Sequence, residues 1–306
     1  MRRGWMLSSV LTGAWLMLAY ASPAFADPPT PVGSEACKDC HQKQYAQYLT
    51  TSHGRAESDG ASLPEKMGCE TCHGPGSAHA AAGGDTKDPG FATIQRPDKM
   101  AAQKANAICL GCHKTGEQFY WQHSAHARKD VACVSCHSIH DSKDGAHARL
   151  LKAENTTALC LTCHKANHLA MGKSAHMPIT GNGLSCNDCH NPHGSAGPKQ
   201  IRALSTTELC VSCHADKRGP FLWEHAPVRE NCLNCHDAHG SNNTRMLVAR
   251  PPFLCNRCHD GSRHPSQLRD QTDVLTGAIT TMNRSCLNCH SQIHGSNHPS
   301  GKTFVR

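Results

Sequence analysis

Every cysteine of this chain belongs to one pentapeptide, C-x-x-C-H, which occurs ten times in 306 residues. This repetition constrains the fold more than any other feature, because two cysteines three residues apart lie on one helical turn with the histidine beside them. No cysteine is left over. The twenty cysteines are Cys37, Cys40, Cys69, Cys72, Cys109, Cys112, Cys133, Cys136, Cys160, Cys163, Cys186, Cys189, Cys210, Cys213, Cys232, Cys235, Cys255, Cys258, Cys286 and Cys289.

The pentapeptide is typical of c-type haem attachment. Its two thiols reach both vinyl groups of one haem as thioethers, and the histidine then lies under the ring and ligates the iron. Zinc ribbons need no invariant following histidine, and thioredoxin-like C-x-x-C sites need a βαβ frame that is absent here. We therefore expect ten covalently bound haems. Their proximal ligands are His41, His73, His113, His137, His164, His190, His214, His236, His259 and His290.

A second histidine ligand is expected on each iron. After residue 26 the chain has six methionines, too few to serve ten irons, whereas 14 histidines remain outside the motifs. Bis-histidine ligation predicts potentials at the low end of the roughly 0.8 V range open to protein haems. Ten of these histidines recur at regular places. The predicted distal ligands are His53, His79, His126, His140, His176, His193, His225, His239, His264 and His294, with His298 as an alternative to His294.

These histidines and motifs define a two-haem unit repeated five times. Each unit reads C-x-x-C-H, His, C-x-x-C-H, His, and the units lie near 37–79, 109–140, 160–193, 210–239 and 255–294. A histidine three residues after its own proximal ligand is badly placed to reach the opposite face of the same ring. We therefore expect it to ligate a neighbouring haem and so tie adjacent units together. The spacing does not tell which distal histidine serves which haem. Outside the pattern, His123, His147, His168 and His298 are read as solvated or supporting histidines.

Residues 1–26 have the features of a secretory signal: Arg2 and Arg3, an uncharged stretch from Trp5 to Tyr20, and Ala24-Phe25-Ala26 before Asp27. We expect this segment to be cleaved and 27–306 to form one decahaem domain. Without Arg2 and Arg3, 29 basic residues face 24 acidic ones, a balance of +5. Ten haems add about twenty propionates, so the loaded protein is expected to be acidic and to have no nucleic-acid partner.

The fold expected is mostly coil with short α-helices, wrapped around an elongated stack of ten haems, with little or no β-sheet. The 280 residues after the signal provide 28 per haem, and hydrophobic residues are only 38%, so the porphyrins must supply most of the buried apolar surface. Ser205 to Glu208 form a capping box before Cys210, and "NTTALC" at 155 begins similarly. The stretch "GPGSAHAAAGGDTKDPG", 74–90, is predicted as loop.

The sequence resembles the periplasmic decahaem cytochromes of the MtrA/DmsE/PioA family over essentially its whole length after the signal. The resemblance rests on ten motifs in this order, on "CHGPGSAH" and "CHNPHGS", on "KRGPFLWEHAPVRENCLNCHDAHGS", and on the ending "RSCLNCHSQIHGSNHPSGK". It implies a wire of bis-histidine haems within an outer-membrane β-barrel porin. The partners it implies are that porin, an extracellular multihaem cytochrome, and a periplasmic or inner-membrane quinol-linked cytochrome.

The predicted function is electron transfer across the outer membrane, with no catalytic residue. One alternative is a soluble periplasmic donor to a DMSO-type terminal reductase. A more remote alternative is a multihaem reductase, which needs an iron with an open distal side and usually a modified motif such as C-x-x-C-K; no such motif occurs in the sequence.

Overall fold

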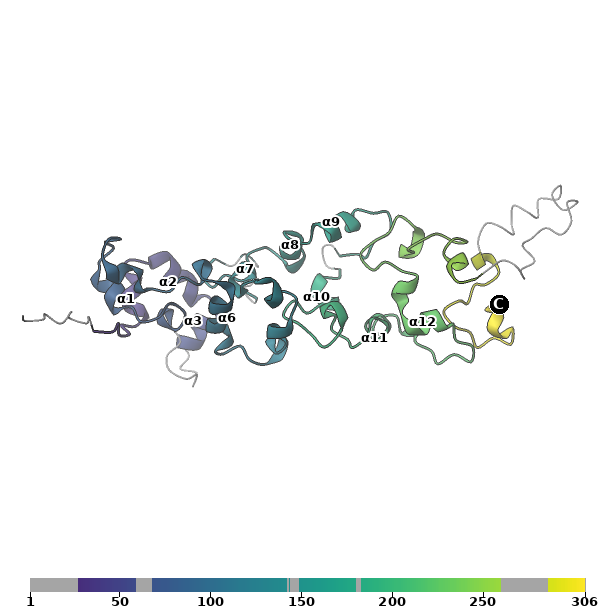
Figure 1. Ribbon diagram of the computed structural model, residues 1–306, viewed down its shortest axis with the longest axis horizontal. Coiled ribbons are helices and arrows are strands. Elements are labelled where there is room, and N and C mark those ends of the chain that lie inside the picture. Colours follow the sequence, from purple (N-terminus) through teal and green to yellow (C-terminus); the bar gives the residue numbers. More distant parts are fainter. Residues whose placement is uncertain are drawn as a thin grey trace, which may run out of the picture.

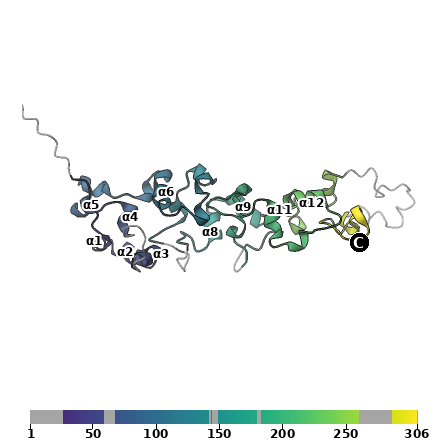
Figure 2. The same ribbon diagram turned by 90° about the horizontal axis from the view of Figure 1, so that it is seen from below.

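The computed structural model describes residues 27–58, 68–141, 143, 149–179, 183–259 and 286–305. The described chain forms an elongated body in which sequence order is also spatial order, from α1 at one end to the C-terminus at the other (Figure 1). The view from below has the same narrow outline (Figure 2). The predicted signal, residues 1–26, lies outside the described residues.

Short helices joined by irregular segments make up this body. The longest described helix, α6, has only nine residues. The α-helices are α1 Ser34–Lys38, α2 Gln42–Leu49, α3 Ser52–Ser58, α4 Cys69–His73, α5 Ser77–Ala81, α6 Ala102–Leu110, α7 Cys133–Cys136, α8 Thr156–Leu161, α9 Lys165–Met171, α10 Cys186–Cys189, α11 Thr206–Val211 and α12 Ala226–Glu230. The 3₁₀ helices are η1 Pro89–Thr93, η2 Pro97–Lys99, η3 Gly116–Gln118, η4 Trp121–His123, η5 Ala127–Lys129, η6 Pro198–Gln200, η7 Ala215–Lys217, η8 Cys232–Asn234, η9 Thr244–Met246, η10 Cys255–Arg257, η12 Cys286–Asn288 and η13 Gly301–Thr303.

No strand or sheet forms among the described residues, where pairing between extended segments is confined to isolated bridges. The bridges join His137 to Leu151, Ala175 to Ser241, His190 to Ile201, Trp223 to Ser296 and His236 to Leu247. Three of them join a motif histidine to the segment that returns to it 11 to 14 residues later. The prediction of a fold of short helices and coil without a sheet is confirmed.

The two predicted helix starts are present. The Ser205 hydroxyl accepts from the Glu208 N–H at 3.1 Å, and the Glu208 carboxylate accepts from the Ser205 N–H at 3.1 Å. In α8 the Asn155 side chain accepts from the Ala158 N–H at 2.8 Å. These caps satisfy N–H groups that a helix of six residues otherwise leaves unpaired.

The loop prediction for residues 74–90 is wrong in part. Helix α5, Ser77–Ala81, lies inside this stretch, and η1 begins at Pro89. The sequence Ser-Ala-His-Ala-Ala contains three alanines, the strongest helix formers, and they outweigh the flanking glycines over one turn. Gly83 and Gly84, both with positive φ, follow the helix.

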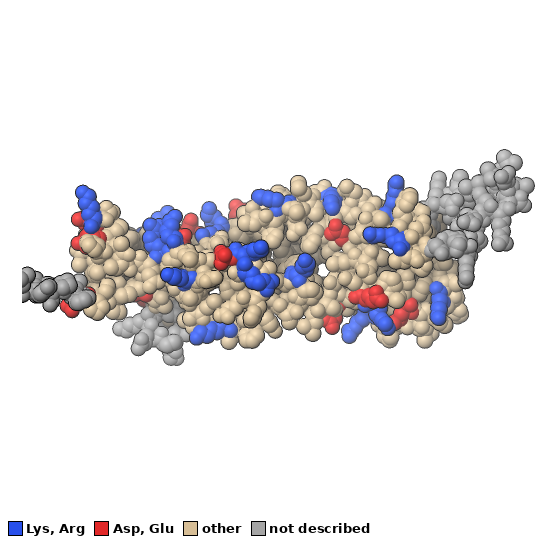
Figure 3. Space-filling view, in the orientation of Figure 1, with Lys and Arg blue, Asp and Glu red and all other residues tan. Residues whose placement is uncertain are grey.

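Buried apolar residues are scattered along the described chain rather than gathered in one core. They are Tyr48, Ala105, Trp121, Leu150, Leu151, Ala170, Ile201 and Leu247. None of the helices in the described ranges has the length and apolar character that crossing a bilayer requires. On the face shown in Figure 3, basic side chains are spread along the body rather than gathered in one patch.

Candidate haem-binding sites

Each C-x-x-C-H motif forms the single helical turn that its spacing predicts. The motif from Cys69 to His73 is helix α4 itself. In the other nine motifs the histidine N–H donates to the carbonyl of the first cysteine at 2.9–3.0 Å. The turn holds two thiols and one imidazole close together, as attachment of one haem requires.

The motifs fall into two sets, which we call the first motifs and the second motifs of the five units. The first motifs begin at Cys37, Cys109, Cys160, Cys210 and Cys255, and the second motifs at Cys69, Cys133, Cys186, Cys232 and Cys286. In the first set the leading cysteine lies near the end of α1, α6, α8 or α11, or opens η10, whereas each second motif opens its own helical turn. The trailing cysteine of every first motif is exposed, but among second motifs only Cys289 is.

The attachment cysteines of neighbouring motifs lie close together. Burial, followed by contact with the Cys69 thiol, raises the pKa of Cys37 to about 11. The corresponding pairs in the other units are Cys109 with Cys133, Cys160 with Cys186, Cys210 with Cys232 and Cys255 with Cys286. Between units the trailing cysteines interact, in the pairs Cys72 with Cys112, Cys136 with Cys163, Cys189 with Cys213 and Cys235 with Cys258. The attachment sites therefore follow one another in sequence order.

Eight motif histidines face a second histidine at nearly the same spacing. The ring centroids are 5.9–6.3 Å apart in every pair. The pairs are His41 with His79, His113 with His53, His73 with His140, His164 with His126, His137 with His193, His190 with His239, His259 with His225 and His236 with His294.

This spacing fits one metal ion between the two rings. A coordinating imidazole nitrogen lies about 2 Å from a metal and about 1 Å from its ring centroid, which places two opposed rings about 6 Å apart. Imidazole and thiol donors are also the groups that c-type haem requires. The residues therefore fit a haem iron held between the two rings.

The pairing crosses unit boundaries in the interior of the chain. His140 lies three residues after His137 but faces His73 of the preceding unit, and His193 likewise faces His137 rather than His190. A second-motif histidine such as His73 or His137 is thus paired with a distal histidine from the following unit. An interior first-motif histidine is paired with one from the preceding unit, as His113 is with His53. The first site is different, since His41 faces His79 of its own unit.

The eight pairs do not include every predicted ligand. His176 and His214 form no ring pair among the described residues, and the His176 Nδ1 instead lies 2.8 Å from the Met177 carbonyl oxygen. His264, the distal histidine predicted for the last unit, lies outside the described residues, as does His147. The ligand assignments as a set stay predictions.

The choice between His294 and His298 is informed by their surroundings. His294 faces His236 with its ring nearly parallel, at 16°. The exposed His298 instead accepts the Ser300 N–H at its Nδ1, at 3.1 Å. His123 and His168 are exposed as well and form no ring pair with another described histidine. This arrangement favours His294 as the ligand.

Backbone carbonyls orient the proximal rings of the second motifs. The Nδ1 atoms of His73 and His137 lie 2.7 Å from the carbonyl oxygens of Gln95 and Arg149. The same contact joins His190 to Lys199 at 3.1 Å, His236 to Arg245 at 2.9 Å, and His290 to Thr303. Because the acceptor fixes the N–H at Nδ1, it leaves Nε2 free to coordinate and makes the imidazole a more basic ligand.

Sequence reasoning missed these acceptors, although the sequence carries a signal for them. In "ARLLK", "PKQIR" and "TRMLV" a basic residue, which supplies the acceptor carbonyl, is followed by one residue and then a buried aliphatic side chain. The residue after the basic one has positive φ in each case, at Leu150, Gln200 and Met246. The repeat of this pattern 9 to 12 residues after second-motif histidines could have been read as a structural element.

Burial favours the neutral form of five distal histidines by lowering their pKa values. It is the largest cause lowering the pKa of His193 to about 4, and the neighbouring His137 adds to the effect. Burial also lowers the pKa of His53, His140, His225 and His294. Neutral imidazole is the form that binds metal, so the site is prepared for ligation near neutral pH.

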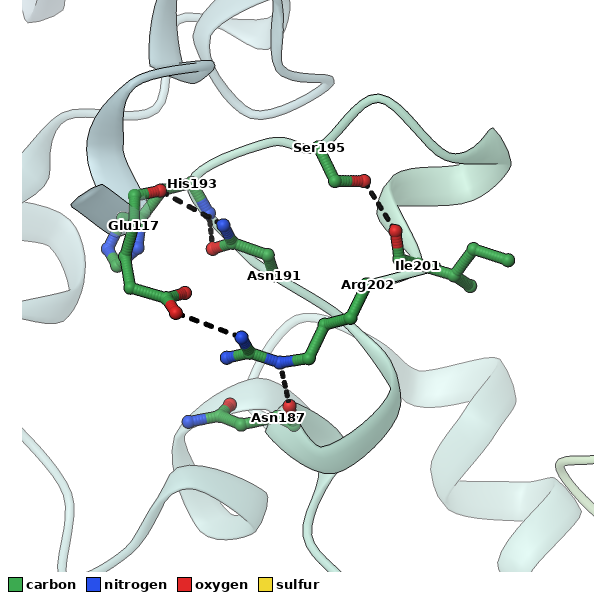
Figure 4. Close-up of polar contacts among 7 residues, drawn as sticks. All are labelled: Glu117, Asn187, Asn191, His193, Ser195, Ile201 and Arg202. Carbon is green, nitrogen blue, oxygen red and sulfur yellow. Dashed lines mark hydrogen bonds and ion pairs between the residues drawn. The ribbon is translucent and has the colours of Figure 1, made fainter. Parts of the chain in front are cut away.

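A polar clamp between the second and third units holds His193 in place (Figure 4). Asn191 is buried, with 8% of its surface exposed. Its Nδ2 donates to the Glu117 carbonyl at 3.0 Å and its Oδ1 accepts from the His193 N–H at 3.0 Å. A hydrogen bond of 2.9 Å from Arg202 lowers the pKa of the Glu117 carboxyl. The distal ligand is thus fixed to the unit whose haem it faces.

Glycine after the distal histidine lets two units approach closely. Gly240 has a φ of +131°, and a Cβ there would collide with the Ala170 carbonyl of the preceding unit. Gly194 has a φ of +107° and meets the Tyr120 backbone in the same way. Only glycine accepts both the conformation and the contact, which explains the His-Gly-Ser sequence at these positions.

Comparisons with known proteins find similar cysteine and histidine motifs in other chains. A family model described as a doubled CXXCH motif matches residues 176–219 and 225–264. A second model, cytochrome c-type protein NrfB-like, matches residues 69–152. The NrfB cytochrome c-type protein of Escherichia coli O6:H1 (strain CFT073) is 30% identical over 131 residues, which cover 42% of this chain and 64% of that protein.

The similarity to a longer relative extends over nearly the whole chain. The multiheme cytochrome MtrA of Shewanella baltica (strain OS185) is 39% identical over 283 residues, covering 90% of this chain and 82% of the relative. With the paired motifs, this identifies covalent haem c as the cofactor and electron transfer as the activity. The chain belongs to the MtrA family of multihaem c-type cytochromes.

Proposed function

We propose that this protein is a wire of ten bis-histidine haems that passes electrons from one end of the molecule to the other. The observation that carries the proposal is the series of eight histidine pairs at 5.9–6.3 Å, arranged in sequence order along the body. Haem supplies a centre that accepts and releases one electron. The polypeptide orders, spaces and tunes ten such centres.

The order of the path is set by the cysteines. Leading cysteines meet within a unit and trailing cysteines meet between units, so each attachment site adjoins the next along the chain. Cross-pairing of histidines between units fixes these neighbours relative to one another. We infer that electrons move serially through the sites in sequence order.

Two histidines on each iron leave no position for a substrate, which argues against a reductase. Electron paramagnetic resonance of the oxidised protein tests this point. We expect only low-spin signals, and a stoichiometric high-spin signal contradicts the proposal. Whole-protein mass spectrometry should show ten haem increments on the polypeptide, and a smaller number would contradict the ten-haem assignment.

We further propose that the wire works within an outer-membrane porin, between periplasmic or inner-membrane quinol-linked cytochromes and an extracellular multihaem cytochrome. The MtrA resemblance and the elongated body support this proposal. The second candidate is a periplasmic donor to a DMSO-type reductase. Purification from detergent-solubilised outer membrane separates the two. A barrel protein in constant ratio to the cytochrome supports the porin complex, and recovery only in the periplasmic fraction supports the donor.

A further inference from the structure

The angle between the two imidazole planes divides the described sites into two kinds. Six pairs are nearly parallel, at 15–23°. His53 with His113 and His126 with His164 are nearly perpendicular, at 71° and 70°. Parallel imidazoles donate π density to the same iron orbital and stabilise the oxidised ion, whereas perpendicular imidazoles divide the donation between two orbitals. A perpendicular site should therefore hold its electron more tightly.

The sites also differ in whether an imidazole Nδ1 atom has a backbone carbonyl as a hydrogen-bond acceptor. In each second-motif pair the proximal ring has a backbone carbonyl acceptor. In two first-motif pairs the distal ring has one: His79 faces the Phe91 carbonyl oxygen at 2.8 Å, and His126 faces that of Pro192 at 2.7 Å. Such bonds make the imidazole more basic and favour the oxidised iron. At a third first-motif site the buried His225 Nδ1 has no hydrogen-bond partner in the described structure, but its ring lies nearly parallel to that of His259, at 23°.

Among the eight paired sites, only that of His53 and His113 combines perpendicular rings with the lack of an acceptor at Nδ1 in the described structure. The His53 Nδ1 is buried and has no hydrogen-bond partner in the described structure. The exposed His113 likewise has no protein acceptor at Nδ1 among the described residues. The two rings also stand at 71°. We propose that the haem held by His53 and His113 has the highest reduction potential of the eight paired sites, and that it is the resting place of an electron in the wire.

Close contacts on both sides hold the backbone at His53. Thr51 is buried, and its hydroxyl donates to the Tyr48 carbonyl at 2.6 Å while accepting the Gly54 N–H at 3.2 Å. A Cβ at Gly54 would collide with the same Tyr48 carbonyl. The backbone of His53 is thus held on both sides in the first turn of α3, Ser52–Ser58.

The inference rests on the proposed bis-histidine ligation but not on transport between the ends. It also has a spectroscopic signature. Perpendicular imidazoles leave two iron orbitals nearly equal in energy, which gives oxidised low-spin haem a single large-g resonance in place of the rhombic spectrum of parallel sites. Two of the eight paired sites should give this signal, and one of them should be the first haem reduced.

The test is a redox titration of the haem-loaded protein followed by electron paramagnetic resonance. We expect about half of the large-g intensity to disappear before any rhombic signal falls. Absence of a large-g signal, or its loss after the rhombic signals, would overturn the proposal without any variant. Failure of end-to-end transfer with this order intact would refute only the wire.

Two matched variants assign the signal. H53A should remove about half of the large-g intensity and introduce one high-spin haem. H79A removes a distal ligand from a nearly parallel site in the same unit, so it should introduce a high-spin haem and leave the large-g signal unchanged. Persistence of the full large-g signal in H53A would overturn the assignment.

Discussion

The first and second motifs of each unit differ in how the protein surrounds their proximal histidines. Second-motif histidines donate to backbone carbonyls, as His137 does to Arg149 at 2.7 Å. First-motif histidines such as His113 and His164 are exposed and have no such acceptor among the described residues. The second motifs therefore provide a uniform series of sites with ring angles of 15–23°.

The first-motif sites vary because their orientation depends on the distal side. Their ring angles range from 17° for His41 with His79 to 71° for His113 with His53. Each interior distal histidine comes from the preceding unit, in a different local turn. The comparison teaches that one pentapeptide yields two kinds of site. Second-motif sites are alike because backbone carbonyls orient their proximal rings, whereas first-motif sites vary because their geometry depends on the turn that carries the distal histidine.

The largest expected effect is the loss of folded structure at both first-motif and second-motif sites when haem is absent. The buried apolar residues, such as Tyr48, Trp121 and Leu247, are scattered and form no common core in the described chain. A chain of this composition cannot offset its conformational entropy by burying side chains alone. We expect the polypeptide produced without haem attachment to show a coil spectrum by far-ultraviolet circular dichroism. A cooperative thermal transition in that polypeptide would contradict this prediction.

Replacing a distal histidine by methionine should raise one potential in either set. For H225M at a first-motif site and H193M at a second-motif site, we expect rises of the order of 0.1–0.3 V, within the roughly 0.8 V range that axial ligands span. The haem at the H193M site should have the lower reduction potential of the two, because His137 keeps its carbonyl acceptor at 2.7 Å. Spectropotentiometric titration measures both. The opposite order would break the distinction between the two sets.

The clamp that supports a second-motif site should contribute less than ligation but a measurable amount. In N191A the Glu117 carbonyl and the His193 N–H lose partners that lie at 3.0 Å, at a residue only 8% exposed. We expect a loss of about 1–3 kcal/mol in the free energy of unfolding of the haem-loaded protein.

The matched control removes the charged arm of the same clamp. The Arg202–Glu117 ion pair has side chains 38% and 52% exposed, so E117Q should cost only about 0–1 kcal/mol. Denaturant unfolding followed through the haem absorbance measures both variants. Equal losses in N191A and E117Q would show that the ion pair, not the buried amide, holds the units together.

The sequence predicts the local turns better than the contacts between units. The spacing of each motif predicts its helical turn because the geometry involves only five residues, and Ser205 with Glu208 predicts a cap for the same reason. The inter-unit position of His140 beside His73 follows from its short separation from His137. The pairing of His41 with His79 inside one unit could not be predicted, because the first-motif sites further along the chain take their distal ring from the preceding unit.

The smallest expected effect is on the stability of the helix caps. We expect it to differ between the residue that caps a first-motif helix and the residue that caps a second-motif helix. The first-motif helix α11 depends on the Ser205 hydroxyl, which accepts the Glu208 N–H at 3.1 Å. S205A should therefore cost about 0.5–2 kcal/mol. Hydrogen exchange of the α11 amides should rise locally, because the cap holds a helix of six residues that leads directly to Cys210.

The matched variant S185A precedes second-motif helix α10. The Ser185 hydroxyl donates to the Asp188 carboxylate at 3.1 Å, but that carboxylate also accepts the Ser185 backbone N–H at 2.6 Å. Alanine keeps the backbone donor, so S185A should change stability by less than about 0.5 kcal/mol. A cost as large as that of S205A would mean that the hydroxyl, and not the backbone, fixes the start of this second motif. That result would contradict the view that backbone groups, rather than side chains, determine the geometry of second-motif sites.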